Sequence, residues 1–225
     1  MGEKRRYMKV KEDKGRQNGG WNNLAKRLLS SISFCLLLST SIFVLSCSEE
    51  ASEEEEFANW QVRNEQFLAS LVNDSLSQSG WQRIKKFSLD PNVEGSASDY
   101  VYVKMIEKGE GTEMPNFTDS VRVVYQGRLI PSKSYSKGYV FDGTVYGNYS
   151  VKTAYTSRQK VSNTISGYTT ALMKMHKGDY WRVYIPSELG YGTAGNGTIP
   201  GYSVLVFDLT LLDISPIGEV MKPWR

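Results

Sequence analysis

The sequence has very few side chains of the kinds that hold metal ions or form nucleophilic relays. It contains two cysteines and one histidine in 225 residues. A zinc site needs several such ligands at defined spacing, so the sequence predicts neither a metal nor another cofactor. The single histidine, His176, stands beside Lys177 in a predicted turn, which argues against a serine–histidine relay. Binding, or chemistry that needs none of these groups, is therefore favoured.

Positive charge is also scarce once the first 46 residues are set aside. They hold nine Lys and Arg and three Asp and Glu, so residues 47–225 carry 18 basic and 21 acidic side chains, a formal net charge of −3. The formal net charge of the whole chain, +3, therefore comes from residues 1–46. It gives no support to nucleic-acid binding by the rest of the chain. Cys35 also lies in residues 1–46, which leaves Cys47 as the only other thiol and predicts no internal disulfide.

Residues 1–46 have the layout of a lipoprotein signal peptide. Lys and Arg are frequent in residues 1–20, and residues 32–45 are almost wholly apolar. This run is roughly 14 residues long, short of the ~20 that span a bilayer, so a signal peptide is favoured over a transmembrane helix. It ends at Val44-Leu45-Ser46-Cys47, which resembles the bacterial lipobox, whose Cys is lipidated and becomes the mature N-terminus. The alternative for Cys47 is an ordinary buried cysteine that follows a core helix. The long leader also makes Met8 a second candidate for the start codon.

Residues 47–56 are predicted to form an acidic tether. The segment Ser48–Glu56 is too charged to bury itself, so we expect it to be solvated and to hold the following domain off the membrane. Acidic residues directly after a lipidated Cys resemble the surface-export signal of some Gram-negative lipoproteins, with a plain linker as the alternative. The predicted location is the cell envelope, anchored by lipid at Cys47 in the outer membrane and facing the periplasm or the cell surface.

Residues 57–99 are predicted to form a helical extension ahead of the main domain. Apolar residues recur at nearly helical spacing from Phe57 to Ser79, and Gly80 ends the pattern. This stripe is expected to pack on the domain that follows, with a partner helix as the alternative. Residues 81–89 have no assignable pattern, and residues 91–99 are predicted to be a loop.

The pattern from residue 100 to residue 225 indicates an α+β domain. Alternating apolar residues predict strands at 101–106, 120–130 and 181–185, and a near-continuous apolar run predicts a central strand at 204–212. Residues 162–175 carry a helical pattern with Ser162 or Asn163 as N-cap, whereas the polar stretch before it has no clear period. The predicted fold is an antiparallel twisted β-sheet that wraps one short α-helix.

A long loop joins the last two predicted strands. It contains four glycines between positions 190 and 197, followed by Pro200 and Gly201, too many for a strand ladder. An ordered loop between core strands is a common support for a binding wall, and this one carries Tyr191 and Ile199.

Seven short motifs occur in order between residues 100 and 214. They are Val123–Gly127, Val140–Asp142, Ile165–Tyr168, Met175–Gly178, Ile185–Gly192, Ile199–Pro200 and Leu205–Asp208. Together, at this spacing, they resemble the FKBP-type peptidyl-prolyl cis-trans isomerase domain. The resemblance implies an FKBP-like fold that isomerises X-Pro bonds without a cofactor. Such bonds exchange slowly unaided, and no covalent bond is broken, so no nucleophile is needed.

The resemblance also implies a cup of aromatic and aliphatic side chains that accepts a proline ring. The catalytic residues would be Tyr125, Phe141, Asp142 and Tyr191, and the substrate-binding residues Ile165, Tyr168, Ile199, Phe207 and Tyr155. Phe141, Tyr168 and Phe207 would grip the ring. Tyr191 and the Ile199 backbone N–H would orient substrate carbonyls, and Asp142 would polarise the carbonyl or hold Tyr125. The family usually has Trp where this chain has Tyr168, and the segment between Phe141 and Ile165 is longer than usual.

The expected function is therefore isomerisation of X-Pro bonds in exported polypeptides, which would assist folding at the cell envelope. Because the floor of the cup is altered at Tyr168, a catalytically weak FKBP-like peptide-binding or chaperone module is the first alternative. The second is a surface lipoprotein with a structural or motility-type assembly role that uses the helix at 57–79 as its contact.

Overall fold

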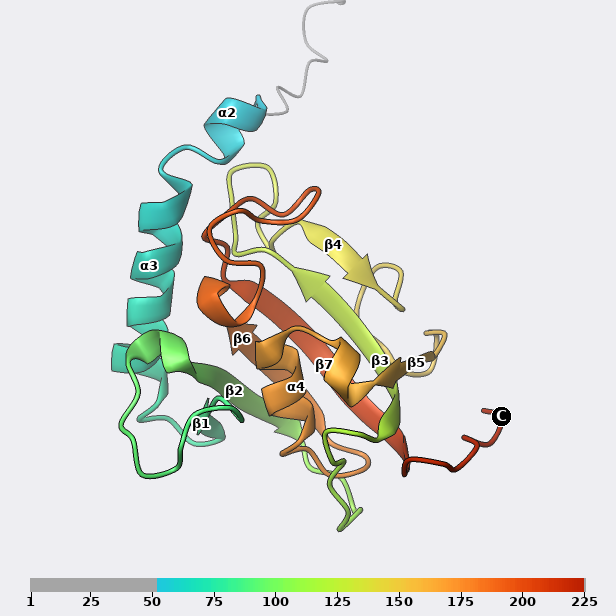
Figure 1. Ribbon diagram of the computed structural model, residues 1–225. Helices are drawn as coiled ribbons and strands as arrows, with labels where there is room; N and C mark the ends of the chain where they lie inside the picture. Colours follow the sequence, from blue (N-terminus) through green and yellow to red (C-terminus); the bar gives the residue numbers. More distant parts are fainter. Residues whose placement is uncertain (1–51, 225) are drawn as a thin grey trace, which may run out of the picture. The chain divides into compact units, whose positions relative to one another are not determined.

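The computed structural model describes residues 52–224 (Figure 1). The predicted signal peptide, the lipidation site Cys47 and the second candidate start Met8 lie outside these residues. In the described part of the chain, no helix has the length and apolarity needed to cross a membrane.

The N-terminal helical extension is present and packs on the domain. It consists of α2 (Glu53–Glu56), α3 (Trp60–Ser70) and the π-helical turn η1 (Leu71–Ser75). Trp60 is buried in the main core, and Leu71 forms a second buried cluster with Tyr100 and Tyr102 of the sheet. The prediction that the apolar stripe packs on the following domain is thus confirmed. Gly80, with a φ of 82°, ends the segment in a conformation that favours glycine.

The expectation of a solvated tether through Glu56 is wrong at its last residue. Glu53–Glu56 forms a helical turn, and the side chain of Glu56 is buried. Its carboxylate oxygens accept hydrogen bonds of 3.1 and 3.2 Å from the Ser134 backbone N–H. An acidic side chain can be buried where backbone donors replace its water, and composition alone does not show such donors.

Seven strands form one antiparallel sheet in the order β1-β2-β6-β7-β3-β4, with β5 also paired to β3. The strands are β1 (Trp81–Lys85), β2 (Tyr100–Glu107), β3 (Ser120–Arg128), β4 (Val140–Gly143), β5 (Ser157–Lys160), β6 (Tyr180–Ile185) and β7 (Leu205–Ser215). The four predicted strands are confirmed, and β7 is central as expected. The sheet begins at β1, ahead of the predicted boundary at residue 100.

Strands β1, β4 and β5 carry no apolar signal strong enough to predict them. The β5 sequence, Ser-Arg-Gln-Lys, is wholly polar, and β1 and β4 are only partly buried. Each lies at the margin of the sheet, where backbone pairing with one neighbour holds the strand and neither face needs to be apolar.

The short helix α4 (Ser166–Leu172) lies across one face of the sheet (Figure 1). It is shorter than the predicted 162–175 and begins after Ile165, because Val161–Asn163 form a separate 3-10 turn, η3. Six of its seven residues are buried. A Cβ at Gly167 would lie 2.3 Å from Ile185 Cγ2, so a glycine here lets the helix approach β6.

Residues on β7 alternate between the two faces of the sheet. Leu205, Phe207, Leu209 and Leu211 belong to the main core cluster on the α4 side. Because successive side chains of a strand point to opposite faces, Val206, Asp208 and Thr210 lie on the other face. That face is partly covered by Tyr149, whose ring stacks on Tyr180 with centroids 4.8 Å apart.

Candidate active site

Three aromatic side chains, each from a different element, meet around Phe207 of β7. The Phe207 ring centroid lies 5.1 Å from that of Tyr168 on α4 and 5.6 Å from that of Phe141 on β4, both edge-on. Tyr125 of β3 lies 6.4 Å from Phe207 and 6.2 Å from Tyr168. Four of the six aromatic residues predicted for the cup are therefore brought together, and three of their four ring pairs have the edge-to-face geometry that aromatic pairs prefer.

Gly127 makes room for two of these rings. A Cβ at this β3 position would lie 2.6 Å from Phe207 and 2.7 Å from Phe141. Both contacts are closer than carbon atoms can approach, so any other residue would displace a ring. The motif Val123–Gly127 thus supplies Tyr125 to the cup and, two residues later, the space for its neighbours.

Asp142 and Tyr125 form the polar part of the cup. The Tyr125 hydroxyl donates a 2.8 Å hydrogen bond to Asp142 Oδ2, while Oδ1 accepts one of 2.8 Å from the Gly143 N–H. Burial and the neighbouring Asp142 carboxylate raise the pKa of Tyr125, so its phenol stays protonated and remains a donor. Of the two roles expected for Asp142, holding Tyr125 is the one that this geometry contains.

Tyr168 has a buried hydroxyl with an unusual environment. The side chain is 4% exposed, and among the described residues its hydroxyl has no hydrogen-bond partner. Burial raises the pKa of this phenol well above its usual value. Because a buried polar group without a partner costs stability, we expect this hydroxyl to destabilise the folded chain.

The remaining predicted site residues lie around this centre with different exposures. Ile165, just before α4, and Tyr191 are partly buried against the core, whereas Ile199 is buried in it. The Ile199 N–H donates to the Asn196 carbonyl at 2.9 Å, so it is not the free donor that we expected for a substrate carbonyl. Tyr155 is 54% exposed, and its hydroxyl donates to the Gly143 carbonyl at 2.9 Å, next to Asp142.

Helix α3 holds the end of the loop that carries Ile199, a contact that the sequence did not reveal. The Trp60 indole N–H donates to Ser203 Oγ at 2.8 Å, and the Ser203 hydroxyl donates to the Pro200 carbonyl at 2.6 Å. One turn along α3, Asn64 Oδ1 accepts from the Val204 N–H at 2.8 Å. The available signal was Asn64, a polar residue four positions after Trp60 on the face that packs on the domain.

Comparisons with known proteins agree on one family. Residues 111–212 match the family model for FKBP-type peptidyl-prolyl cis-trans isomerase. The chain is 31% identical over 199 residues to the macrophage infectivity potentiator of Trypanosoma cruzi, covering 84% of this chain and 86% of that protein. It is 34% identical over 132 residues to the FKBP-type peptidyl-prolyl cis-trans isomerase FkpA of Escherichia coli K12, covering 59% of this chain and 44% of that protein. The crystal structure of Escherichia coli FkpA has a similar fold, with a TM-score of 0.53 at 24% identity over 85% of this chain and 72% of that chain.

Proposed function

The chain belongs to the FKBP-type peptidyl-prolyl cis-trans isomerases, whose substrates are proline-containing polypeptides, and we propose that its aromatic cup isomerises X-Pro bonds of exported proteins at the cell envelope. The observation that carries the assignment of the site is the meeting of Tyr125, Phe141, Tyr168 and Phe207. Two of these rings, Tyr168 and Phe207, are nearly inaccessible to water.

The cup suits the chemistry of prolyl rotation. The planar amide is stabilised by resonance, and this resonance is lost when the bond twists by about 90° in the transition state. A dry aromatic surface favours the twisted, less dipolar amide over the planar one, which lowers the barrier without a nucleophile. The Asp142 carboxylate is engaged by Tyr125 and by Gly143, so it presents Tyr125 rather than an isolated charge to the proline ring.

The decisive experiment measures prolyl isomerisation of short X-Pro peptides by the purified chain and two variants. In Phe141→Ala we expect kcat/KM to fall by about tenfold or more, because one wall of the cup is removed. Phe117→Ala, an exposed aromatic outside the cup, is the matched control and should retain activity. Equal losses in the two alanine variants would place the site elsewhere.

Tyr168 favours a second candidate, in which the cup holds proline-bearing segments with little turnover. Its hydroxyl, partnerless among the described residues, occupies the floor, where the family usually has Trp. Under this candidate the parent binds peptides at saturation without acceleration, and Tyr168→Trp gains activity. Absence of acceleration in both would favour a pure binding module, whereas a fast parent would exclude it.

The envelope location rests on the sequence at the front of the chain. The basic and apolar leader that precedes Cys47 supports export and lipid attachment. The proposed location of the anchor is the outer membrane, with the domain facing the periplasm or the cell surface. Expression of the parent and Cys47→Ser in a Gram-negative bacterium with radiolabelled palmitate tests it. We expect label and membrane association in the parent alone, and an unlabelled parent would remove the anchor.

A further inference from the structure

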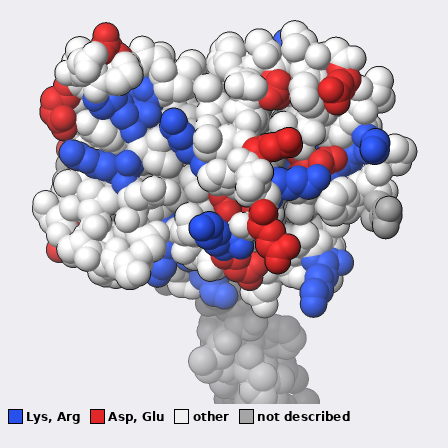
Figure 2. Space-filling model, turned by 90° about the horizontal axis from the view of Figure 1, so that it is seen from below, with Lys and Arg blue, Asp and Glu red and all other residues white. Residues whose placement is uncertain are grey.

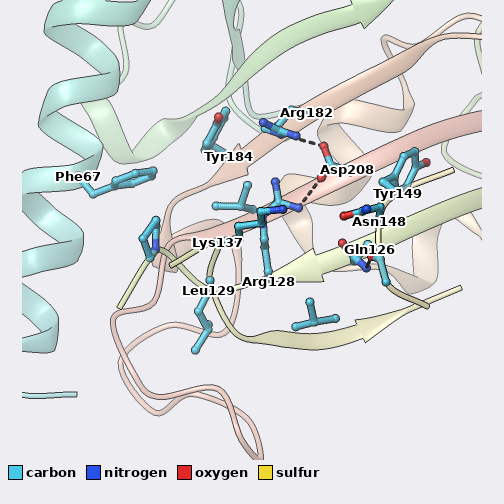
Figure 3. A pocket seen from close by; sticks show the side chains of 15 residues that line it. Phe67, Gln126, Arg128, Leu129, Lys137, Asn148, Tyr149, Arg182, Tyr184 and Asp208 are labelled. Carbon is cyan, nitrogen blue, oxygen red and sulfur yellow. Dashed lines mark hydrogen bonds and ion pairs between the residues drawn. The ribbon is translucent and has the colours of Figure 1, made fainter. Parts of the chain in front are cut away.

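A groove of about 560 Å³ lies over strands β3, β6 and β7 (Figure 3). It is on the sheet face opposite the aromatic cup, because its lining residues Val206 and Asp208 alternate with Phe207 along β7. Its floor is formed by outward residues of β3, β6 and β7, among them Arg128, Arg182 and Asp208. Phe67 of α3 lies on one side, and Asn148 and Tyr149 lie on the other. Phe207 and Asp208 are consecutive residues, so the cup and the groove are separated by the thickness of one sheet.

The floor carries more positive than negative charge. Asp208 is buried, and its Oδ1 accepts hydrogen bonds from Arg182 Nε at 2.8 Å and from the Tyr180 hydroxyl at 3.1 Å. Arg128 Nη1 pairs with the other oxygen. Lys137, which is exposed, also lines the groove, and no acidic residue other than Asp208 does so within residues 52–224. Three cations and one carboxylate therefore line the groove, a formal excess of two positive charges.

The two guanidinium groups have donors to spare. Asp208 engages a single nitrogen of Arg128 and a single nitrogen of Arg182, whereas a guanidinium carries five N–H donors. Both groups are held in place by the buried carboxylate, and the Arg182 side chain remains 35% exposed. Such a preorganised guanidinium is well suited to a second, incoming carboxylate.

The segment after β4 forms one wall of the groove and is held to β3 by hydrogen bonds. Gln126 of β3 donates to the Gly147 carbonyl at 3.2 Å, and the Tyr149 hydroxyl donates to the Val124 carbonyl at 2.8 Å. Three residues of this segment, Gly147, Asn148 and Tyr149, form a side of the groove.

The other lining residues determine what accompanies the carboxylate. Phe67, Val140, Tyr184 and Val206 provide apolar surface beside the cations. Figure 2 shows one face of the molecule, on which the blue basic and red acidic side chains are interspersed. We propose that the groove binds an acidic polypeptide segment in which carboxylates alternate with aromatic or aliphatic side chains. This site is independent of the isomerase activity.

The test uses a proline-free fluorescent peptide in which phenylalanine alternates with glutamate, titrated with the purified full chain. The same peptide with glutamine in place of glutamate controls for charge. Lys137→Glu reverses an exposed charge in the groove, and Val140→Glu adds a carboxylate at a position that is 46% exposed. Lys108→Glu makes the same charge reversal at an exposed lysine outside the groove, and Phe141→Ala alters the cup.

We expect the glutamate peptide to bind at least about tenfold more tightly than the glutamine peptide. Lys137→Glu and Val140→Glu should each weaken binding by about tenfold, and Lys108→Glu and Phe141→Ala by less than about twofold. Equal binding of the two peptides, equal loss in Lys108→Glu and Lys137→Glu, or loss in Phe141→Ala would each overturn the proposal. So would the absence of binding at millimolar protein.

Discussion

The two faces of the sheet have opposite chemistry although they share the same strands. On β7, Phe207 meets Tyr168 and Phe141 in an aromatic cup, whereas Asp208 is surrounded by Arg128, Arg182 and Tyr180. The cup is held together by ring contacts and the groove by charge-assisted hydrogen bonds. Strand alternation therefore allows two surfaces of different polarity to be built within one thickness of backbone.

The two faces are also stabilised by different interactions. In the cup, removal of one ring leaves its neighbours packed on the remaining core. In the groove, Asp208 is the only carboxylate within residues 52–224 that pairs with the two arginines, so loss of its charge leaves both partly buried guanidiniums without compensation. We therefore expect the largest stability effect on the groove face and the largest activity effect on the cup face.

The largest effect is expected for Asp208→Asn. Breaking a buried ion pair by neutralising one partner costs about 3 kcal/mol in the free energy of unfolding, towards the low end because Arg182 is partly exposed. Urea unfolding measures this. Asp213→Asn, which breaks the more exposed pair with Lys177, should cost less than about 1 kcal/mol. If the two variants were equally stable, the charge cluster would not be the main support of that face.

The central strands and the residues of the cup could be predicted from the sequence because the signals are local. The alternation around Tyr125 and the apolar run through Phe207 indicate buried strands. Most cup residues lie within the short motifs of the family resemblance, so the resemblance identifies them directly. The groove could not be predicted, since Phe67, Arg128, Tyr149 and Asp208 come from four separate segments with no shared period. Likewise, the Trp60–Ser203 hydrogen bond joins residues 143 positions apart.

An intermediate effect is expected for Trp60→Phe, which alters the connection between α3 and the loop of the cup. The change removes the hydrogen bond to Ser203 and some buried surface, and should cost about 2 kcal/mol in stability. Because the loop then loses one anchor near Ile199, we expect KM for X-Pro peptides to rise a few-fold (about 1 kcal/mol) with kcat less changed. This outcome would identify Trp60 as a positioning residue.

The control for this variant is Val62→Ala, at a half-exposed position on the same helix. It should alter helix stability slightly and leave KM unchanged. A rise of KM in both variants would assign the effect to general loosening of α3 and not to the Ser203 contact. Binding of the acidic peptide in the groove should be the same in both, since neither residue lines it.

The smallest effect is expected for Tyr168→Phe, which removes from the floor of the cup a hydroxyl that has no partner among the described residues. Without a hydrogen bond to lose, the variant should be as stable as the parent or more stable by up to about 1 kcal/mol at pH 7. Its isomerase activity should be retained, in contrast to Tyr125→Phe, which loses the bond to Asp142. A loss of about 1 kcal/mol or more would show that the Tyr168 hydroxyl has a favourable partner after all.

The difference in stability between Tyr168→Phe and the parent should also depend on pH. Burial raises the pKa of Tyr168 in the folded chain above the value of 10.0 that applies when it is unfolded. The unfolded state therefore releases this proton first, and the parent loses stability as pH rises above about 10. The phenylalanine ring of the variant has no proton to release, so the stability difference between Tyr168→Phe and the parent should widen between pH 9 and pH 11, roughly the range around that unfolded value. Urea unfolding at several pH values measures this difference. Ionisation of the other tyrosines affects both proteins equally, so its contribution cancels in the difference. A constant difference across this range would mean that water reaches the Tyr168 hydroxyl in the folded protein.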